Sequence, residues 1–130
     1  MTARIIMHTA ADVPAPAGHY SHAVEANGML FVSGILSVRA DENAADLTLA
    51  QQIDRCLETL DKVLRAAGTD RSHVAKLTVY IADVAWWPQV NAHCAAYFRD
   101  HRPARAIVPV STLHYGAAIE IEAIALVGAR

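Results

Sequence analysis

The 130-residue chain lacks the cysteine motifs and long apolar runs that mark several classes of protein. Its two cysteines, Cys56 and Cys94, show no CxxC or other metal-ligand spacing, so we expect the reduced cysteines of a cytoplasmic protein. No apolar run approaches the roughly 20 residues that span a bilayer, and no membrane contact is predicted. Residues 1–10 carry one arginine and no apolar segment typical of a signal peptide, so none is expected.

An excess of charge and the common binding motifs are also missing. The formal net charge is -2 and no basic stripe occurs, which argues against binding to nucleic acid. The seven histidines are scattered and no HExxH motif occurs, so no metal site is predicted. Neither a GxGxxG motif nor a P-loop is present, so the sequence carries no nucleotide-binding signature.

The chain does have enough apolar residues for a packed core. Hydrophobic residues make up 54% and charged residues 18%, which predicts one folded domain over residues 1–130. Asn27-Gly28 lies between two apolar runs and predicts a hairpin turn, because both residues tolerate positive φ. Apolar residues then recur three and four positions apart up to Ala67, and Gly68 stands where a helix C-terminal cap is expected.

These patterns predict an α+β fold. Strands are expected at residues 4–7, 20–25, 29–36, 73–84, 104–113 and 117–127, and helices at 46–67 and 85–101. Two helices in this order would pack on one face of a mixed sheet of about six strands. The other face would then need cover, and in a chain of this length we expect self-association to supply it.

The last quarter of the chain places charge inside apolar strands. Arg105 begins one such run, and its planar fork of donors suits a carboxylate. Glu120 and Glu122 alternate with isoleucines and therefore share one face of a strand, where one of them could activate a water as general base. From the residues alone, solvated or paired surface charge is the favoured interpretation of both features, and the functional one stays open.

Other polar side chains are less specific. Tyr20, Ser33 and Asn91 could each form hydrogen bonds to a ligand, but none forms a motif by itself. Trp86 and Trp87 are expected to anchor the second helix in the core or in an interface.

Five segments together resemble one known family, the Rid family of reactive intermediate deaminases, also called YjgF-like or enamine/imine deaminases. They are Gly18-His19-Tyr20-Ser21-His22-Ala23-Val24, Gly28-Met29-Leu30-Phe31-Val32-Ser33-Gly34, Asn91-Ala92 with Tyr97-Phe98, Pro103-Ala104-Arg105, and Ile119-Glu120-Ile121-Glu122-Ala123-Ile124-Ala125. The resemblance covers nearly the whole chain, in the family's order and at about its spacing.

The resemblance implies a chorismate-mutase-like α+β fold, a homotrimer with ligand clefts between subunits, and hydrolysis of 2-aminoacrylate-type enamines and imines to a 2-keto acid and ammonia without a cofactor. It implies that Arg105 binds the substrate carboxylate and that Glu120 activates water. The remaining substrate-binding positions that it implies are Tyr20, Ser33, Gly34, Asn91 and the backbone N–H of Ile107. Glu122 is left with a structural role.

The chain departs from the family pattern around that cleft. The family usually has hydroxyl or small polar residues where this chain has Ala106 and Ile107, and often an acid in place of Pro109. Ile35 replaces a common Gln, His19 and His22 replace Pro and Gln, and His114-Tyr115 replaces a Pro-basic pair. We therefore expect a divergent member that prefers a bulkier or more apolar imino acid than 2-iminopropanoate.

Two other functions stay open on the sequence. One is a non-catalytic trimeric or regulatory protein that binds small carboxylates. The other is a deaminase that acts on an aminated ring-cleavage product with the same scaffold.

Overall fold

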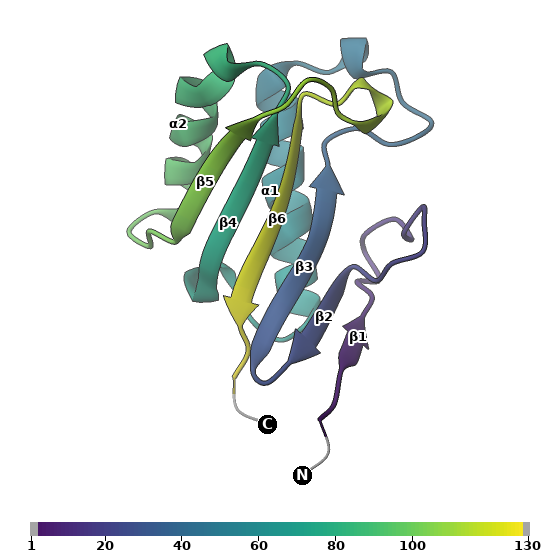
Figure 1. Ribbon diagram of the computed structural model, residues 1–130, viewed down its shortest axis with the longest axis vertical. Helices are drawn as coiled ribbons and strands as arrows, with labels where there is room; N and C mark the ends of the chain where they lie inside the picture. Colours follow the sequence, from purple (N-terminus) through teal and green to yellow (C-terminus); the bar gives the residue numbers. More distant parts are fainter. Residues whose placement is uncertain (1–2, 129–130) are drawn as a thin grey trace.

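The computed structural model describes residues 3–128, and the ends of the predicted domain at residues 1–2 and 129–130 lie outside the described part. Its strands are β1 (Ile6–His8), β2 (Ala23–Ala26), β3 (Met29–Leu36), β4 (Val74–Ile81), β5 (Ala104–Pro109) and β6 (Ile119–Leu126). Its α-helices are α1 (Leu49–Ala66) and α2 (Trp87–Phe98). The strands form one sheet in the order β1-β2-β3-β6-β4-β5 (Figure 1).

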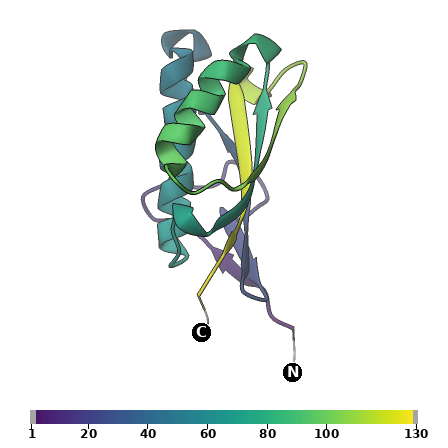
Figure 2. The same cartoon turned by 90° about the vertical axis from the view of Figure 1, so that its left-hand side faces the viewer.

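The sheet is mixed, because β4 and β5 are parallel while every other neighbouring pair is antiparallel. Both helices lie on the same face of this sheet, as the side view shows (Figure 2). The predicted α+β class, the six-stranded mixed sheet and the two helices on one face are therefore confirmed.

The local signals in the sequence explain where elements begin and end. Asn27 and Gly28 have φ of 52° and 75°, which is the geometry of the predicted two-residue hairpin turn. Thr48 caps α1, since its side chain accepts from the N–H of Gln51 while the Gln51 side chain accepts from the Thr48 N–H. Gly68 has φ of 81° just past the helix, as its position after Ala67 predicted.

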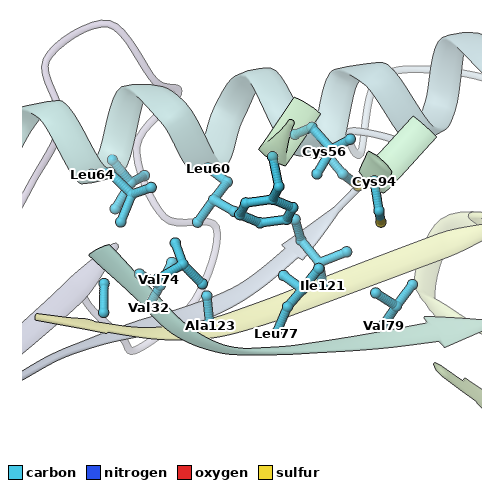
Figure 3. Close-up of a cluster of buried hydrophobic side chains, with 14 of the residues drawn as sticks. Val32, Cys56, Leu60, Leu64, Val74, Leu77, Val79, Cys94, Ile121 and Ala123 are labelled. Atoms are coloured by element: carbon cyan, nitrogen blue, oxygen red, sulfur yellow. The ribbon is translucent and has the colours of Figure 1, made fainter. Parts of the chain in front are cut away.

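The core lies between the helices and the sheet. Figure 3 shows Cys56, Leu60 and Leu64 of α1 facing side chains of the three central strands. Those strand residues are Val32, Val74, Leu77, Val79, Ile121 and Ala123, and all are buried. Burying a side chain of this size contributes about 1.5–3 kcal/mol, so this layer fixes how β6 and β4 lie under the helices. Cys56 and Cys94 are both free and buried in it.

The opposite face of the sheet carries an apolar patch. Cross-strand pairing places Met7 beside Val24, Val24 beside Phe31, and Phe31 beside Ile124 in one continuous row. Met7 and Phe31 keep 74% and 42% of their surface exposed. We call this row the open-face patch. A row of exposed apolar side chains on a sheet is a surface that association with another chain would cover.

Three predicted boundaries are wrong in an informative way. The predicted strand at 20–25 begins only at Ala23, since the preceding residues are held in a loop by side-chain bonds described below. The predicted helix at 85–101 ends at Phe98, because Arg99 adopts φ of 58°. The predicted strand at 104–113 ends at Pro109, because its neighbour β4 ends at Ile81, to whose carbonyl the Val110 N–H donates a last hydrogen bond of 2.8 Å. The strand predicted at 29–36 matches β3 at both ends, and each of the other boundaries lies within three residues of the prediction.

Within residues 3–128, no helix combines the length and the apolar character needed to cross a membrane.

Candidate functional site

A cleft of about 940 Å³ opens where several segments meet. Its lining comes from the loop at 13–20, Ser33 and Gly34 of β3, the segment at 38–41, one side of α1, His114 and Tyr115 of a short 3-10 turn, and Glu120 of β6. Four of the predicted site residues, Tyr20, Ser33, Gly34 and Glu120, are thus brought to one cavity from positions up to 100 residues apart.

A β-bulge brings β3 and β6 together at this cleft. Val32 pairs with Ala123 and Ile35 pairs with Ile121, so β3 has one residue more than β6 between the two pairs. Gly34 is in the bulge, and a Cβ placed on it would lie 2.7 Å from the Oε2 of Glu120. Glycine at this position leaves room for the Glu120 carboxylate, which any side chain there would push aside.

Glu120 is half-buried on the face of the sheet away from the helices. Desolvation by burial raises the pKa of its carboxyl, the nearby charge of Glu122 raises it further, and His114 opposes the shift. The Glu122 carboxylate accepts a hydrogen bond of 2.7 Å from the Tyr80 hydroxyl. A carboxylate with a raised pKa at a cleft is a better acceptor of a proton from water than an ordinary surface carboxylate.

Tyr20 is held at the mouth of the cleft by bonds on both sides of it. Ser33 donates a hydrogen bond of 2.6 Å from its hydroxyl to the carbonyl oxygen of Ser21. The Tyr20 N–H donates to the Gly18 carbonyl, 3.1 Å away. The loop is thereby fixed to the bulge, while the Tyr20 side chain keeps 50% of its surface exposed. Ser33 thus positions the loop as well as lining the cavity.

His22, one of the departures from the family pattern, is buried behind this loop. Its Nδ1 accepts from the Ala10 N–H at 3.0 Å. Its Nε2 lies 2.9 Å from the Pro14 carbonyl oxygen, and since that oxygen can only accept, Nε2 carries the proton. His22 is therefore a neutral structural side chain that ties residues 10–14 to β2.

Arg105 and Asn91 form a separate cluster at the β5 edge of the sheet. Arg105 Nη1 donates to Asn91 Oδ1 at 2.9 Å, and its guanidinium lies 5.6 Å from the centre of the Trp87 ring. Arg105 is exposed and Ile107, two residues on, packs partly against the core. These contacts hold the guanidinium in place and leave several of its five donors for a ligand.

Within one chain, Arg105 and Glu120 cannot both contact a small molecule. In the register, Arg105 lies beside Leu77, whose side chain is buried under the helices, whereas Glu120 lies beside Tyr80 on the open face. Glu120 and Arg105 are separated by one intervening strand and are offset along it by three residues, a Cα separation of roughly 14 Å from standard strand spacings.

The sequence reasoning missed several polar residues near the cleft. Arg39 and Arg55 both line it, and Arg55 donates to both carboxylate oxygens of Glu42, at 2.6 and 2.7 Å. Behind them, buried Gln52 accepts from the Ser37 hydroxyl at 2.7 Å and from the Ala118 N–H at 2.8 Å. In the sequence, the only signal for this network is Gln52, a polar residue at a core position of the helical pattern.

No candidate metal centre is found in the described part of the chain: across residues 3–128, no three His, Cys, Asp or Glu side chains lie close enough together to hold an ion.

Comparison with known proteins gives a match to a family model, a similar curated protein and two similar solved structures. Residues 10–127 match the family model described as Endoribonuclease L-PSP. The chain is 38% identical over 118 residues to the 2-iminobutanoate/2-iminopropanoate deaminase of Rattus norvegicus, covering 88% of this chain and 85% of that protein.

Two solved structures extend the comparison to the fold. The yeast protein YEO7 superposes with a TM-score of 0.89 at 30% identity, covering 96% of this chain and all of the other. The structure of E. coli TdcF with bound serine gives a TM-score of 0.85 at 27% identity, covering 95% of this chain and 99% of that one.

Proposed function

The chain belongs to the Endoribonuclease L-PSP family, the Rid or YjgF-like family that its motifs resemble, and from this we propose that it hydrolyses reactive imines to 2-keto acids and ammonia. Enamines enter the same reaction after they tautomerise to imines. The observation that carries the proposal is the approach of the Glu120 carboxylate to the backbone of Gly34, inside a cleft that also holds Tyr20.

In the proposed reaction Glu120 takes a proton from a water molecule as the water oxygen bonds to the imine carbon. The Glu120 carboxyl gives this proton to the imine nitrogen, which completes a neutral carbinolamine. The hydroxyl proton of the carbinolamine then passes through the Glu120 carboxylate to the nitrogen as the C–N bond breaks and the C=O bond forms, and ammonia and the 2-keto acid leave. The raised pKa of Glu120 supports this role, because a general base works best when its pKa is close to the working pH. A general base of this kind typically accelerates a reaction by about 10²–10⁴-fold.

Arg105 is proposed to bind the substrate carboxylate with two parallel N–H bonds. Since Arg105 and Glu120 of one chain project to opposite faces of the sheet, we propose that the complete site forms between copies of the chain, as a homotrimer. One copy supplies Glu120, Gly34, Ser33 and Tyr20. Its neighbour supplies the edge strand β5 with Arg105, Asn91 and the Ile107 backbone N–H.

The first test is ammonia and 2-keto acid release from freshly generated imino acids by the pure protein. Arg105→Ala should raise KM by roughly 10²-fold or more, because two charge-assisted bonds worth about 1.5–3 kcal/mol each are lost. Glu120→Ala should lower kcat by about 10²–10⁴. Arg102→Ala, a neighbouring exposed arginine, is the matched control and should leave both constants unchanged. Unchanged rates in both site variants would refute the mechanism.

The second test asks whether two chains share each site. Arg105→Ala and Glu120→Ala chains, each inactive, are unfolded, mixed in equal amounts and refolded together. If each site takes Arg105 from one chain and Glu120 from another, about a quarter of the sites in a random assembly are intact and activity returns to that level. If both residues act from one chain, the mixture stays inactive. Size-exclusion chromatography with light scattering establishes that the chains assemble.

A binder without turnover is the second candidate function. The solved E. coli TdcF structure with bound serine supports it, because that related protein holds a small carboxylate. For this chain the hypothesis predicts 2-keto acid binding that is lost in Arg105→Ala, and no ammonia release from any imine. Aminomuconate-like compounds in the same assay test for a deaminase of ring-cleavage products.

A further inference from the structure

The cleft has an aromatic wall whose backbone is held in an uncommon conformation. His114 and Tyr115 lie with ring centroids 3.7 Å apart and planes 29° apart, so the two rings are stacked. Both line the cleft together with Glu120. We call this pair the aromatic wall. It stands where the sequence departs from the family's Pro-basic pair.

Tyr115 adopts φ of 60° and ψ of 17°, in the left-handed region that bulky residues rarely occupy. The conformation is held by two turn bonds, from the Gly116 N–H to the Leu113 carbonyl and from the Ala117 N–H to the His114 carbonyl, both 3.2 Å. Asn or Gly would fit this backbone without strain. Strained residues of this kind cluster at ligand sites, and Tyr115 lines the cleft.

The rest of the cleft suits a flat apolar group. Tyr20 adds a second exposed ring to the cleft, and Leu36, which pairs with Glu120, contributes an apolar side chain on the same face of the sheet. The volume of about 940 Å³ greatly exceeds what a three-carbon imino acid fills. Arg39, Arg55 and Glu120 also line the cleft, so its apolar part is the side with the aromatic rings. A ligand ring packed against that side would be removed from water, which favours its binding.

Glu120 fixes how a substrate would be oriented in this cavity. Its carboxylate lies beside Gly34 at one end, and His114 is close enough to influence its charge. A 2-imino acid whose reacting carbon meets Glu120 has two further substituents, a carboxylate and a side chain. With the carboxylate directed toward the neighbouring copy's β5, the side chain is left to face the aromatic wall.

We propose that the cleft selects 2-imino acids with an aromatic side chain, which packs against the outer face of the stacked His114–Tyr115 pair. This assignment rests on the proposed function for its reaction but concerns the choice of substrate. The preference is a property of binding and can be measured on the 2-keto acid products, whether or not the protein turns an imine over.

Isothermal titration calorimetry of the whole protein with three 2-keto acids tests the proposal. We expect phenylpyruvate to bind at least about tenfold more tightly than pyruvate, from the burial and stacking of its ring. Ketoisocaproate, which has a branched aliphatic side chain, should fall between them. Equal affinity for phenylpyruvate and ketoisocaproate would show a merely apolar cleft and overturn the aromatic assignment, as would equal affinity for all three or binding of none.

Two substitutions of Tyr115 distinguish a contribution of its ring to binding from an effect on the fold. Tyr115→Asn keeps the left-handed backbone and removes the ring, so the phenylpyruvate-to-pyruvate affinity ratio should fall by about three- to tenfold. Tyr115→Phe keeps the ring and should restore the ratio. A ratio that Tyr115→Asn leaves unchanged would overturn the proposal, and circular dichroism of both variants shows that the fold is retained.

The activity assay distinguishes failure of this inference from failure of the proposed function. Hydrolysis of small and aromatic imines at equal kcat/KM would overturn the aromatic preference and leave the deaminase proposal standing. Selective binding of phenylpyruvate without hydrolysis of any imine would support the aromatic site and overturn the deaminase proposal.

Discussion

At the scale of single residues, the geometry of the cleft depends on Gly34, which leaves room for the Glu120 side chain. Gly34→Ala should fold with little loss of stability, because the atoms that its Cβ would meet are the movable end of the Glu120 side chain. The same methyl group displaces the carboxylate from its position in the cleft. We expect kcat to fall by about 10²-fold or more, since a shift of about 1 Å in a catalytic group has that effect.

Activity assays and thermal melts of Gly34→Ala are the measurements. Gly128→Ala is the matched control, because a Cβ at Gly128 meets nothing within 4 Å, and it should alter neither quantity. A Gly34→Ala protein with normal kcat would mean that the observed position of Glu120 is not needed for the reaction.

The second residue-scale prediction concerns pH. Burial and then the charge of Glu122 raise the pKa of Glu120, so the ionised base is lost as the pH falls through a range above that of an ordinary Glu. The acid limb of the kcat/KM profile should lie in that range. In Glu122→Gln one raising cause is gone while a Gln oxygen can still accept from Tyr80, so the limb should move to lower pH.

A pH–rate profile from about pH 4 to 9 gives the result for wild type and variant. Glu58→Gln, an exposed acid on α1, should reproduce the wild-type profile. An acid limb that stays in place in Glu122→Gln, or moves to higher pH, would contradict the assignment of Glu120 as the titrating base.

At the scale of elements, α1 holds β6 in place through one buried amide. Gln52 accepts hydrogen bonds from the Ser37 hydroxyl and the Ala118 N–H, and Ala118 lies two residues before Glu120. Gln52→Leu preserves size but leaves both donors buried and unsatisfied, at about 1–3 kcal/mol each. We expect the free energy of unfolding to fall by about 2–4 kcal/mol, measured by urea denaturation.

Gln89→Leu provides the comparison, because Gln89 is exposed on α2 and its replacement should change stability by less than about 0.5 kcal/mol. If Gln52→Leu were as stable as Gln89→Leu, the amide would not be the link between α1 and the start of β6.

At the scale of the whole molecule, the open-face patch is where association is expected. Phe31 lies in the middle of the row that Met7, Val24 and Ile124 complete, and it is 42% exposed. Phe31→Glu would place a charge in a covered apolar interface, which is costly unless it is paired. Analytical ultracentrifugation should therefore show the wild type as an oligomer and the variant as a monomer at micromolar concentration.

Because each complete site is proposed to need two chains, Phe31→Glu should also lose most activity although it is not in the cleft. Val84→Glu, at an exposed apolar residue outside this sheet face, is the matched control and should remain assembled. A wild-type protein that sediments as a monomer at micromolar concentration would contradict the shared site.

The local chemistry of the chain determined much of the fold. Asn27-Gly28 specifies its turn because both residues accept positive φ, and Thr48 and Gly68 mark the ends of α1 because they satisfy orphan backbone groups. The alternation around Glu120 and Glu122 assigned both to one face of β6. These are short-range effects, and the neighbouring residues suffice to predict them.

The grouping of the site residues was decided only by the tertiary structure. Strand order and register put Arg105 and Glu120 on opposite faces, and no local pattern reports which strands become neighbours. The bulge that presses Gly34 against Glu120 and the left-handed Tyr115 beside it likewise depend on contacts between distant segments. The sequence by itself predicted which groups would take part in the proposed reaction, whereas packing decided which of them one chain can bring together.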